Sequence, residues 1–173
     1  VFNPSALKAV KSLVLAHSAA GNEQLAASRA LEAAQANPDD PDAISLTAFS
    51  MRSAGRLDEA IALCESALQR NPSFELYYLL GVCYEENHQP ERALSAYRRT
   101  ARARPNNVEV LERIAHLELR QGNDKEAITA FERAADAGAN HIQTYLALGR
   151  LYADSGNRHQ AEVIYRRILQ EDF

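Results

Sequence analysis

A small residue recurs along this chain at a nearly constant interval, and no other feature restricts the fold as strongly. Five alanines are separated by 34, 33, 34 and 34 residues, and these are Ala26, Ala60, Ala93, Ala127 and Ala161. Self-similarity with such a period is typical of a helical solenoid, in which each repeat buries its apolar face against its neighbours. The interval therefore predicts five stacked repeats.

Turn-forming residues recur with the same period. A glycine stands five residues before four of the alanines, and His88 takes that place in the third repeat; the glycines are Gly21, Gly55, Gly122 and Gly156. A proline follows each of the first three alanines twelve residues later, at Pro38, Pro72 and Pro105. Because Gly commonly ends helices and Pro cannot continue them, the series predict one turn within each repeat and another between repeats.

Each repeat is predicted to be a pair of α-helices. In the third repeat, Leu76, Leu80 and Tyr84 recur at the spacing of one helix face. Pro90 then stands where a second helix begins, a position that needs no backbone N–H. A residue without a side chain, Gly81, is expected where the two helices cross, because close approach requires small residues.

These residues resemble the tetratricopeptide repeat. The third repeat carries the family pattern as Tyr77, Leu80, Gly81, Tyr84, Ala93, Tyr97 and Pro105, and the fifth carries it as Tyr145, Leu148, Gly149, Tyr152, Ala161 and Tyr165. The resemblance implies an all-α, right-handed superhelical solenoid forming one domain over residues 1–173. The expected repeats are 7–40, 41–73, 74–107, 108–141 and 142–173. We also expect the chain to be a fragment of a longer protein, because no polar capping helix follows the last repeat.

Composition disfavours two classes of partner. The net charge is −4, whereas binding to phosphate backbones requires an excess of Lys and Arg. Four arginines between residues 98 and 104 are interpreted as a solvated face, with contact to an anionic partner, RNA included, as the alternative. No apolar run approaches the ~18 residues that a membrane span needs.

Of the 19 basic residues 16 are Arg, which is typical of GC-rich, often bacterial genomes. The compartment, cytoplasm or periplasm, stays open.

No motif for catalysis or for a cofactor is present in the sequence. The five histidines are scattered, and there is no HExxH, no Gly-x-Ser-x-Gly and no glycine-rich phosphate loop. Cys64 and Cys83 lack metal-ligand spacing and are expected to be buried apolar residues. We therefore predict a protein that is not an enzyme and that holds neither metal nor cofactor.

The resemblance implies that the first helix of each repeat lines a concave groove. Helical phase then gives the candidate partner-binding residues as Lys11, Leu15, Phe49, Arg52, Tyr78, Val82, Glu85, Glu109, Glu112, His116, Arg120 and Arg150. An apolar or aromatic line is expected along the groove, because Leu15, Phe49, Val82 and His116 hold the same place in successive repeats. Exposed apolar surface of this kind commonly marks a contact site, and the glutamates give the groove an acidic middle.

The function that follows is a scaffold that binds a peptide or helical segment of a partner protein, one with apolar anchors and basic side chains. One alternative is a self-assembling element that associates through its open ends, where the last helix presents Val163, Ile164, Ile168 and Leu169. Another is a regulatory arm of a larger enzyme or of a bacterial secretion or polysaccharide-export component.

Overall fold

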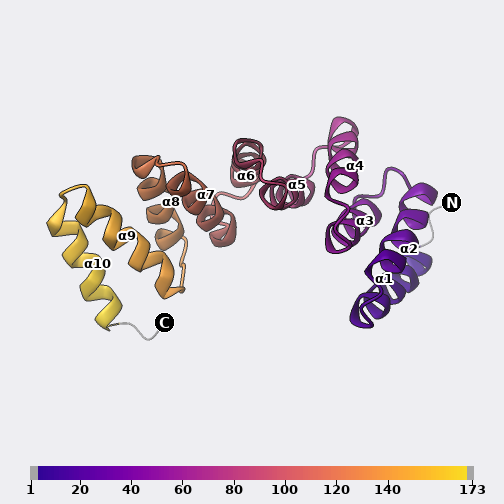
Figure 1. Ribbon diagram of the computed structural model, residues 1–173, viewed down its shortest axis with the longest axis horizontal. Helices are drawn as coiled ribbons and strands as arrows, with labels where there is room; N and C mark the ends of the chain where they lie inside the picture. The colour runs from indigo at the N-terminus through magenta and orange to yellow at the C-terminus, as the bar shows by residue number, and fades with distance from the viewer. Residues whose placement is uncertain (1–3, 171–173) are drawn as a thin grey trace. The chain divides into compact units, whose positions relative to one another are not determined.

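A computed structural model describes residues 4–170, and these residues form ten α-helices (Figure 1). The helices are α1 (Pro4–Ala19), α2 (Glu23–Ala36), α3 (Pro41–Ser53), α4 (Leu57–Arg70), α5 (Phe74–Glu86), α6 (Pro90–Ala103), α7 (Val108–Arg120), α8 (Asp124–Asp136), α9 (Ile142–Asp154) and α10 (Arg158–Gln170). The described residues contain no strand, so the predicted all-α class is confirmed.

Local residues account for where the first helices of the repeats begin. Helices α3, α5, α7 and α9 start at residues 41, 74, 108 and 142, which are the first residues of the expected repeats, and α1 starts three residues before position 7. The side chains of Asp40 and Asn107 accept hydrogen bonds from the backbone N–H groups of Asp42 and Val110, at 2.9 and 3.0 Å. Such caps satisfy donors that a helix leaves without partners at its N-terminus.

The turn inside each repeat requires a left-handed backbone. The four periodic glycines have positive φ, and so does His88 in the third repeat, with φ of 56°. A residue with a Cβ adopts this conformation at a cost of roughly 1–2 kcal/mol, which explains why glycine holds the place elsewhere. His88 nevertheless forms the same turn, and α6 begins two residues later at Pro90, as predicted.

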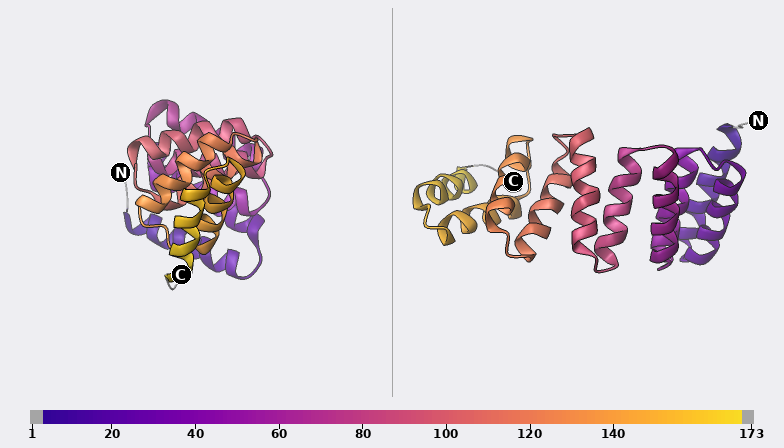
Figure 2. Two further views of the ribbon diagram at one scale, coloured as in Figure 1. Left: turned by 90° about the vertical axis from the view of Figure 1, so that its left-hand side faces the viewer. Right: turned by 90° about the horizontal axis from the view of Figure 1, so that it is seen from above.

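The helices group into two compact units, residues 1–99 and residues 100–173, with the division inside α6. In the first unit each helix from α1 to α5 packs against the next, and α3 also contacts α1 and α5, so the first helices of neighbouring repeats lie side by side (Figure 2). In the second unit α7, α8, α9 and α10 pack in chain order. Within each unit, neighbouring hairpins thus bury apolar faces against one another.

Small residues and aromatic rings together fill the space between helices. The periodic alanines are buried, and the largest fully buried side chains include Tyr97, Phe131 and Tyr145. A Cβ placed on Gly81 would lie 2.6 Å from Cε1 of Tyr97, well inside van der Waals contact. Gly81 is therefore the residue that allows the Tyr97 ring to lie between α5 and α6, and the fold depends on this pairing of the smallest residue with a large one.

Both cysteines are free and buried in the first unit, as predicted. Burial raises the pKa of the Cys64 thiol to about 12 and that of the Cys83 thiol to about 11, because the thiolate is poorly solvated inside the protein. Thiols of this kind are inert, since the thiolate is the reactive form.

We expect both thiols to react with Ellman's reagent at mildly alkaline pH at least ~100-fold more slowly in the folded protein than in guanidinium chloride, where their pKa returns to about 8.5. The measurement is the release of the coloured thiolate with and without denaturant. Rapid modification of the folded chain would contradict the buried placement.

None of the helices between residues 4 and 170 is both long enough and apolar enough to cross a membrane.

Candidate functional site

An exposed aromatic side chain of the first unit lies on α3, between α1 and α5. Phe49 is 45% exposed, and Leu15, which holds the same place on α1, is 54% exposed. The guanidinium carbon of Arg52 lies 5.0 Å from the centre of the Phe49 ring, and its Nη1 is 2.6 Å from Oε1 of Glu86 on α5. We call the side of α1, α3 and α5 that carries Leu15, Phe49 and Tyr78 the first-helix face.

The contact of Arg52 with Glu86 fixes the position of the cation above one part of the Phe49 ring. A cation at this distance is attracted to the negative face of an aromatic ring. Because Glu86 extends from the neighbouring repeat, the guanidinium is shared between α3 and α5. The rest of the Phe49 ring remains open to solvent, and it forms an apolar contact surface with a charged border.

Val82 does not continue the apolar line onto α5. It is only 6% exposed, although it holds the same place in its repeat as Phe49. Valine is shorter than phenylalanine, so its side chain does not extend as far from the helix. The exposed apolar surface of this unit therefore comes from Leu15 and Phe49, with a contribution from the half-buried Tyr78.

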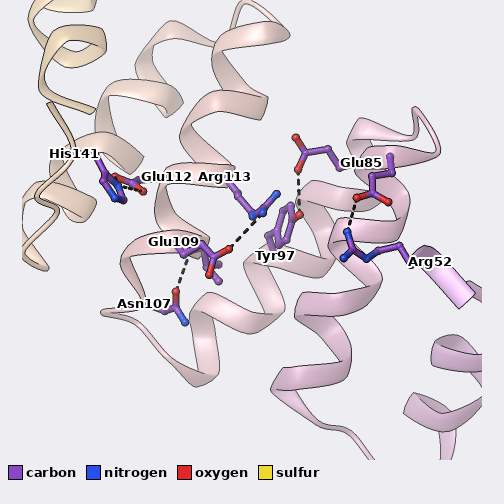
Figure 3. A network of polar contacts seen from close by, with 10 residues as sticks. Arg52, Glu85, Tyr97, Asn107, Glu109, Glu112, Arg113 and His141 are labelled. Atoms are coloured by element: carbon purple, nitrogen blue, oxygen red, sulfur yellow. Dashed lines mark hydrogen bonds and ion pairs between the residues drawn. The ribbon is translucent and has the colours of Figure 1, made fainter. Parts of the chain in front are cut away.

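Glu85 and Tyr78 are tied to the second helix of their own repeat. The hydroxyl of Tyr97 donates a hydrogen bond to Oε2 of Glu85 at 3.1 Å (Figure 3). The Tyr78 ring lies 6.1 Å from the Tyr97 ring, centre to centre, in a tilted arrangement. Both residues are half-buried, so their outer parts alone are available to a partner.

Charges of opposite sign border the first-helix face on its two sides. Lys8 and Lys11 are exposed on α1, and Glu75 and Glu86 are exposed on α5. Glu86 is paired with Arg52. The carboxylate of Glu75 accepts a hydrogen bond from the hydroxyl of Ser73, and this contact does not neutralise its negative charge. The face is thus basic on one edge and acidic on the other.

The second unit carries an open pocket between α7 and the start of α9. It has a volume of about 410 Å³ and is lined by Glu112, His116 and residues 140–144. The carboxylate of Glu112 accepts a short hydrogen bond from the hydroxyl of Thr144 and lies 3.2 Å from Nδ1 of His141 (Figure 3). The Glu112 side chain is 13% exposed, so its carboxylate contacts mainly protein groups and little solvent.

The other candidate residues of the second unit lie on its surface. The His116 ring meets Phe131 edge to face, with centres 5.0 Å apart, and its outer side is exposed. Glu109 is exposed, with Oε1 3.4 Å from Nη2 of Arg113 on the next turn. Arg120 and Arg150 are exposed as well. Among the residues that the structure describes, no three His, Cys, Asp or Glu side chains are grouped so as to hold a metal ion.

A polar contact between consecutive repeats was not predicted from the sequence. The hydroxyl of Tyr84 donates to Glu65 on the preceding second helix, and the hydroxyl of Tyr152 donates to Glu132 in the same manner. Burial and the adjacent carboxylate raise the pKa of both phenols, that of Tyr152 to about 12. A glutamate 19 or 20 residues before the tyrosine of the repeat pattern is the signal that could have found these pairs.

Comparison with protein families agrees with the helix hairpins and their pattern. Two models described as tetratricopeptide repeat match residues 78–142 and 142–173. A third, described as anaphase-promoting complex, cyclosome, subunit 3, matches residues 17–100. The chain belongs to the tetratricopeptide-repeat family. The resemblance predicted from the sequence is confirmed, and it places the protein among protein-interaction scaffolds.

Solved structures with the same fold include several of MamA. The chain is similar to a crystal structure of MamA protein with a TM-score of 0.79 and 18% identity, covering 95% of this chain and 90% of that one. It is similar to MamA from Desulfovibrio magneticus RS-1 with a TM-score of 0.77 and 16% identity, covering 95% and 93%. At this identity the similarity concerns the fold. Among curated proteins, no sequence is significantly similar to the chain.

Proposed function

We propose that this tetratricopeptide-repeat chain binds a segment of a partner protein on the first-helix face of residues 1–99. The observation that carries the proposal is the exposed Phe49 ring beneath Arg52, with the exposed Leu15 at the same place on α1. Aromatic and Arg side chains are enriched among the residues that dominate binding energy at protein interfaces. A partner that covers the ring would displace water from apolar surface at the centre of a charged border.

The charges of the face suggest the chemistry of the segment and its orientation. A segment with an apolar anchor on Phe49, basic residues over Glu75 on α5 and acidic residues over Lys8 and Lys11 on α1 would complement both edges. Charge of this kind contributes mainly to orientation and association rate, whereas the apolar contact contributes most of the affinity. The pocket beside Glu112 and His116, with the exposed Glu109, Arg120 and Arg150, is proposed as an additional contact in the second unit.

The test uses a peptide selected from a random phage-displayed library against the whole chain. Phe49→Ala together with Tyr78→Ala is expected to weaken binding of that peptide by more than ~2 kcal/mol, about 30-fold, because both rings would leave the interface. Isothermal titration calorimetry measures the affinity, and circular dichroism establishes that the double variant remains folded.

Leu25→Ala provides the matched control, because Leu25 is a similarly exposed apolar residue on α2, away from the first-helix face. Its removal is expected to leave the affinity unchanged. If the folded double variant binds the selected peptide as tightly as the unsubstituted chain does, the first-helix face is not the binding site.

A further inference from the structure

The open pocket of the second unit lies at the junction of the fourth and fifth repeats, between α7 and the start of α9. Among the residues that line it, Glu112 is the single carboxylate, and none is Lys or Arg. The pocket therefore presents one acidic group in a space of about 410 Å³ that side chains of the same unit leave open. We call it the Glu112 pocket.

The negative charge of Glu112 is not balanced by a basic side chain. Its contacts are the hydroxyl of Thr144 and Nδ1 of His141, and within residues 4–170 no Lys or Arg pairs with it. The side chain is only 13% exposed, and a carboxylate withdrawn from water in this way is normally paired with a cation. His141 is itself exposed, so an incoming group can take its place beside the carboxylate.

The start of α9 balances part of this charge. The helix has no acidic residue in its first turn, and the side chain of its N-cap residue, His141, forms no capping hydrogen bond. A carboxylate near this end of a helix is stabilised by the helix dipole, which is equivalent to roughly half a positive charge. The pocket therefore retains a net negative charge that favours a cationic ligand.

The contact that holds Glu112 is particular to this junction. Thr144 is buried, and the same place in the earlier repeats is held by residues that are buried and apolar, namely Ala43, Leu76 and Val110. An apolar residue thus satisfies the packing of the repeat at this place. The hydroxyl of Thr144 has a different effect, since it donates a hydrogen bond to Glu112 and holds the carboxylate at the wall of the pocket.

Apolar and aromatic groups border the carboxylate. Ile142 is exposed in the pocket wall, and Leu146 is exposed one turn further along α9. The His116 ring is held edge to face on Phe131 with its outer side exposed. Arginine combines apolar methylene groups with a planar guanidinium that stacks on aromatic rings and pairs with a carboxylate through two parallel hydrogen bonds. Its side chain therefore matches each part of this wall.

We propose that the Glu112 pocket binds an arginine side chain of the partner segment. The guanidinium pairs with the Glu112 carboxylate and lies along the His116 ring, and the methylene groups contact Ile142. The side-chain amides of Asn140 and Gln143, which are exposed in the pocket wall, supply acceptors for the remaining guanidinium N–H groups. This assignment rests on the proposed function, because the arginine belongs to a bound protein segment, and it names the chemistry that the second unit recognises.

The probe is N-acetyl-arginine N-methylamide, and its citrulline analogue is the matched control ligand, because citrulline keeps the planar shape and lacks the charge. Backbone amide signals of the isotope-labelled whole chain are followed by NMR during titration. The arginine probe is expected to shift the signals of residues 140–144 with a dissociation constant of ~1–10 mM, since so small a ligand makes few contacts. The citrulline probe is expected to bind at least ~10-fold more weakly.

Three variants locate the contact. Glu112→Gln removes the charge but keeps an oxygen for the Thr144 hydroxyl, and it is expected to abolish the preference for arginine over citrulline. Glu126→Gln removes the same charge from an exposed position on α8 and is expected to keep that preference. Ile142→Ala is expected to weaken binding of the arginine probe about 3-fold, because the methylene groups lose an apolar contact. Circular dichroism establishes that each variant is folded, and the comparison of the two ligands on the unsubstituted chain needs no variant.

The double variant with Phe49→Ala and Tyr78→Ala separates this proposal from binding at the first-helix face. It is expected to bind the arginine probe as the unsubstituted chain does, whatever its effect on the selected peptide.

Three results would overturn the proposal. Equal affinity for the arginine and citrulline probes would exclude recognition of the guanidinium charge. Signal shifts confined to residues outside the pocket would place the arginine elsewhere. Free arginine that binds at least ~10-fold more tightly than the blocked probe would assign the pocket to a free amino acid and not to a protein segment.

Discussion

Phe131→Ala is expected to lower the free energy of unfolding by about 3–5 kcal/mol, because truncation of a fully buried ring removes its transfer free energy and leaves a cavity. Phe131 lies in α8 of the second unit, and its ring contacts His116 edge to face. The neighbouring side chains cannot fill this cavity without moving, because the alanines around the helix crossing are too short to extend into it. Urea denaturation followed by far-UV circular dichroism measures the loss.

Tyr165→Ala is the matched control for this substitution. It removes a ring from the same place in the repeat, but the Tyr165 ring is partly in solvent. The expected loss is about 1–2 kcal/mol, because less apolar surface returns to water and no closed cavity forms. Equal losses for the two variants would show that the Tyr165 ring is packed as tightly as the buried Phe131 ring.

Gly81→Val is expected to lower the free energy of unfolding by about 3 kcal/mol, the upper part of the range for overpacking. The Cβ of any residue at position 81 would collide with the Tyr97 ring, which is fully buried and donates a hydrogen bond to Glu85. The ring therefore has no free space into which it can move. The same denaturation experiment measures the effect.

Two further variants test whether the collision with the Tyr97 ring causes the loss of stability in Gly81→Val. Gly149→Val introduces a comparable collision, with a Cβ 2.7 Å from Cε1 of Tyr165, but that ring borders solvent and can shift. It is expected to lose less stability than Gly81→Val does. Tyr97→Leu should restore part of the loss when combined with Gly81→Val, and additive losses in the double variant would exclude the collision as the source.

The helices were predictable from the sequence because their signals are local and repeated. Pro41 and Pro90 mark helix starts, and the left-handed turns lie at the periodic glycines and at His88. Burial of the periodic alanines follows from the same pattern, because a residue at a helix crossing is covered whichever repeat it belongs to. A signal that occurs five times is also difficult to misread, since one irregular repeat does not hide it.

The candidate site was less predictable because exposure depends on neighbours that are distant in sequence. Helical phase gives the direction of Val82 but not its exposed fraction, which is only 6%. Phase likewise gives the direction of Glu112, whereas its hydrogen bond with Thr144 joins residues 32 positions apart. For Phe49 the guanidinium of Arg52 covers only part of the ring, so the side chain is exposed as expected.

The hydrogen bonds of Tyr84 with Glu65 and of Tyr152 with Glu132 also govern the order in which hairpins can follow one another. The hairpins share one backbone conformation, so packing of alanines alone would allow any hairpin to replace another. The hydrogen bond from a tyrosine to a glutamate makes each such junction specific for a hairpin that carries the tyrosine. A shuffled chain in which the fifth hairpin directly follows the second would still place Tyr152 opposite Glu65 and keep its bond, whereas one in which the second hairpin follows the fourth would place Met51 opposite Glu132 and lose it.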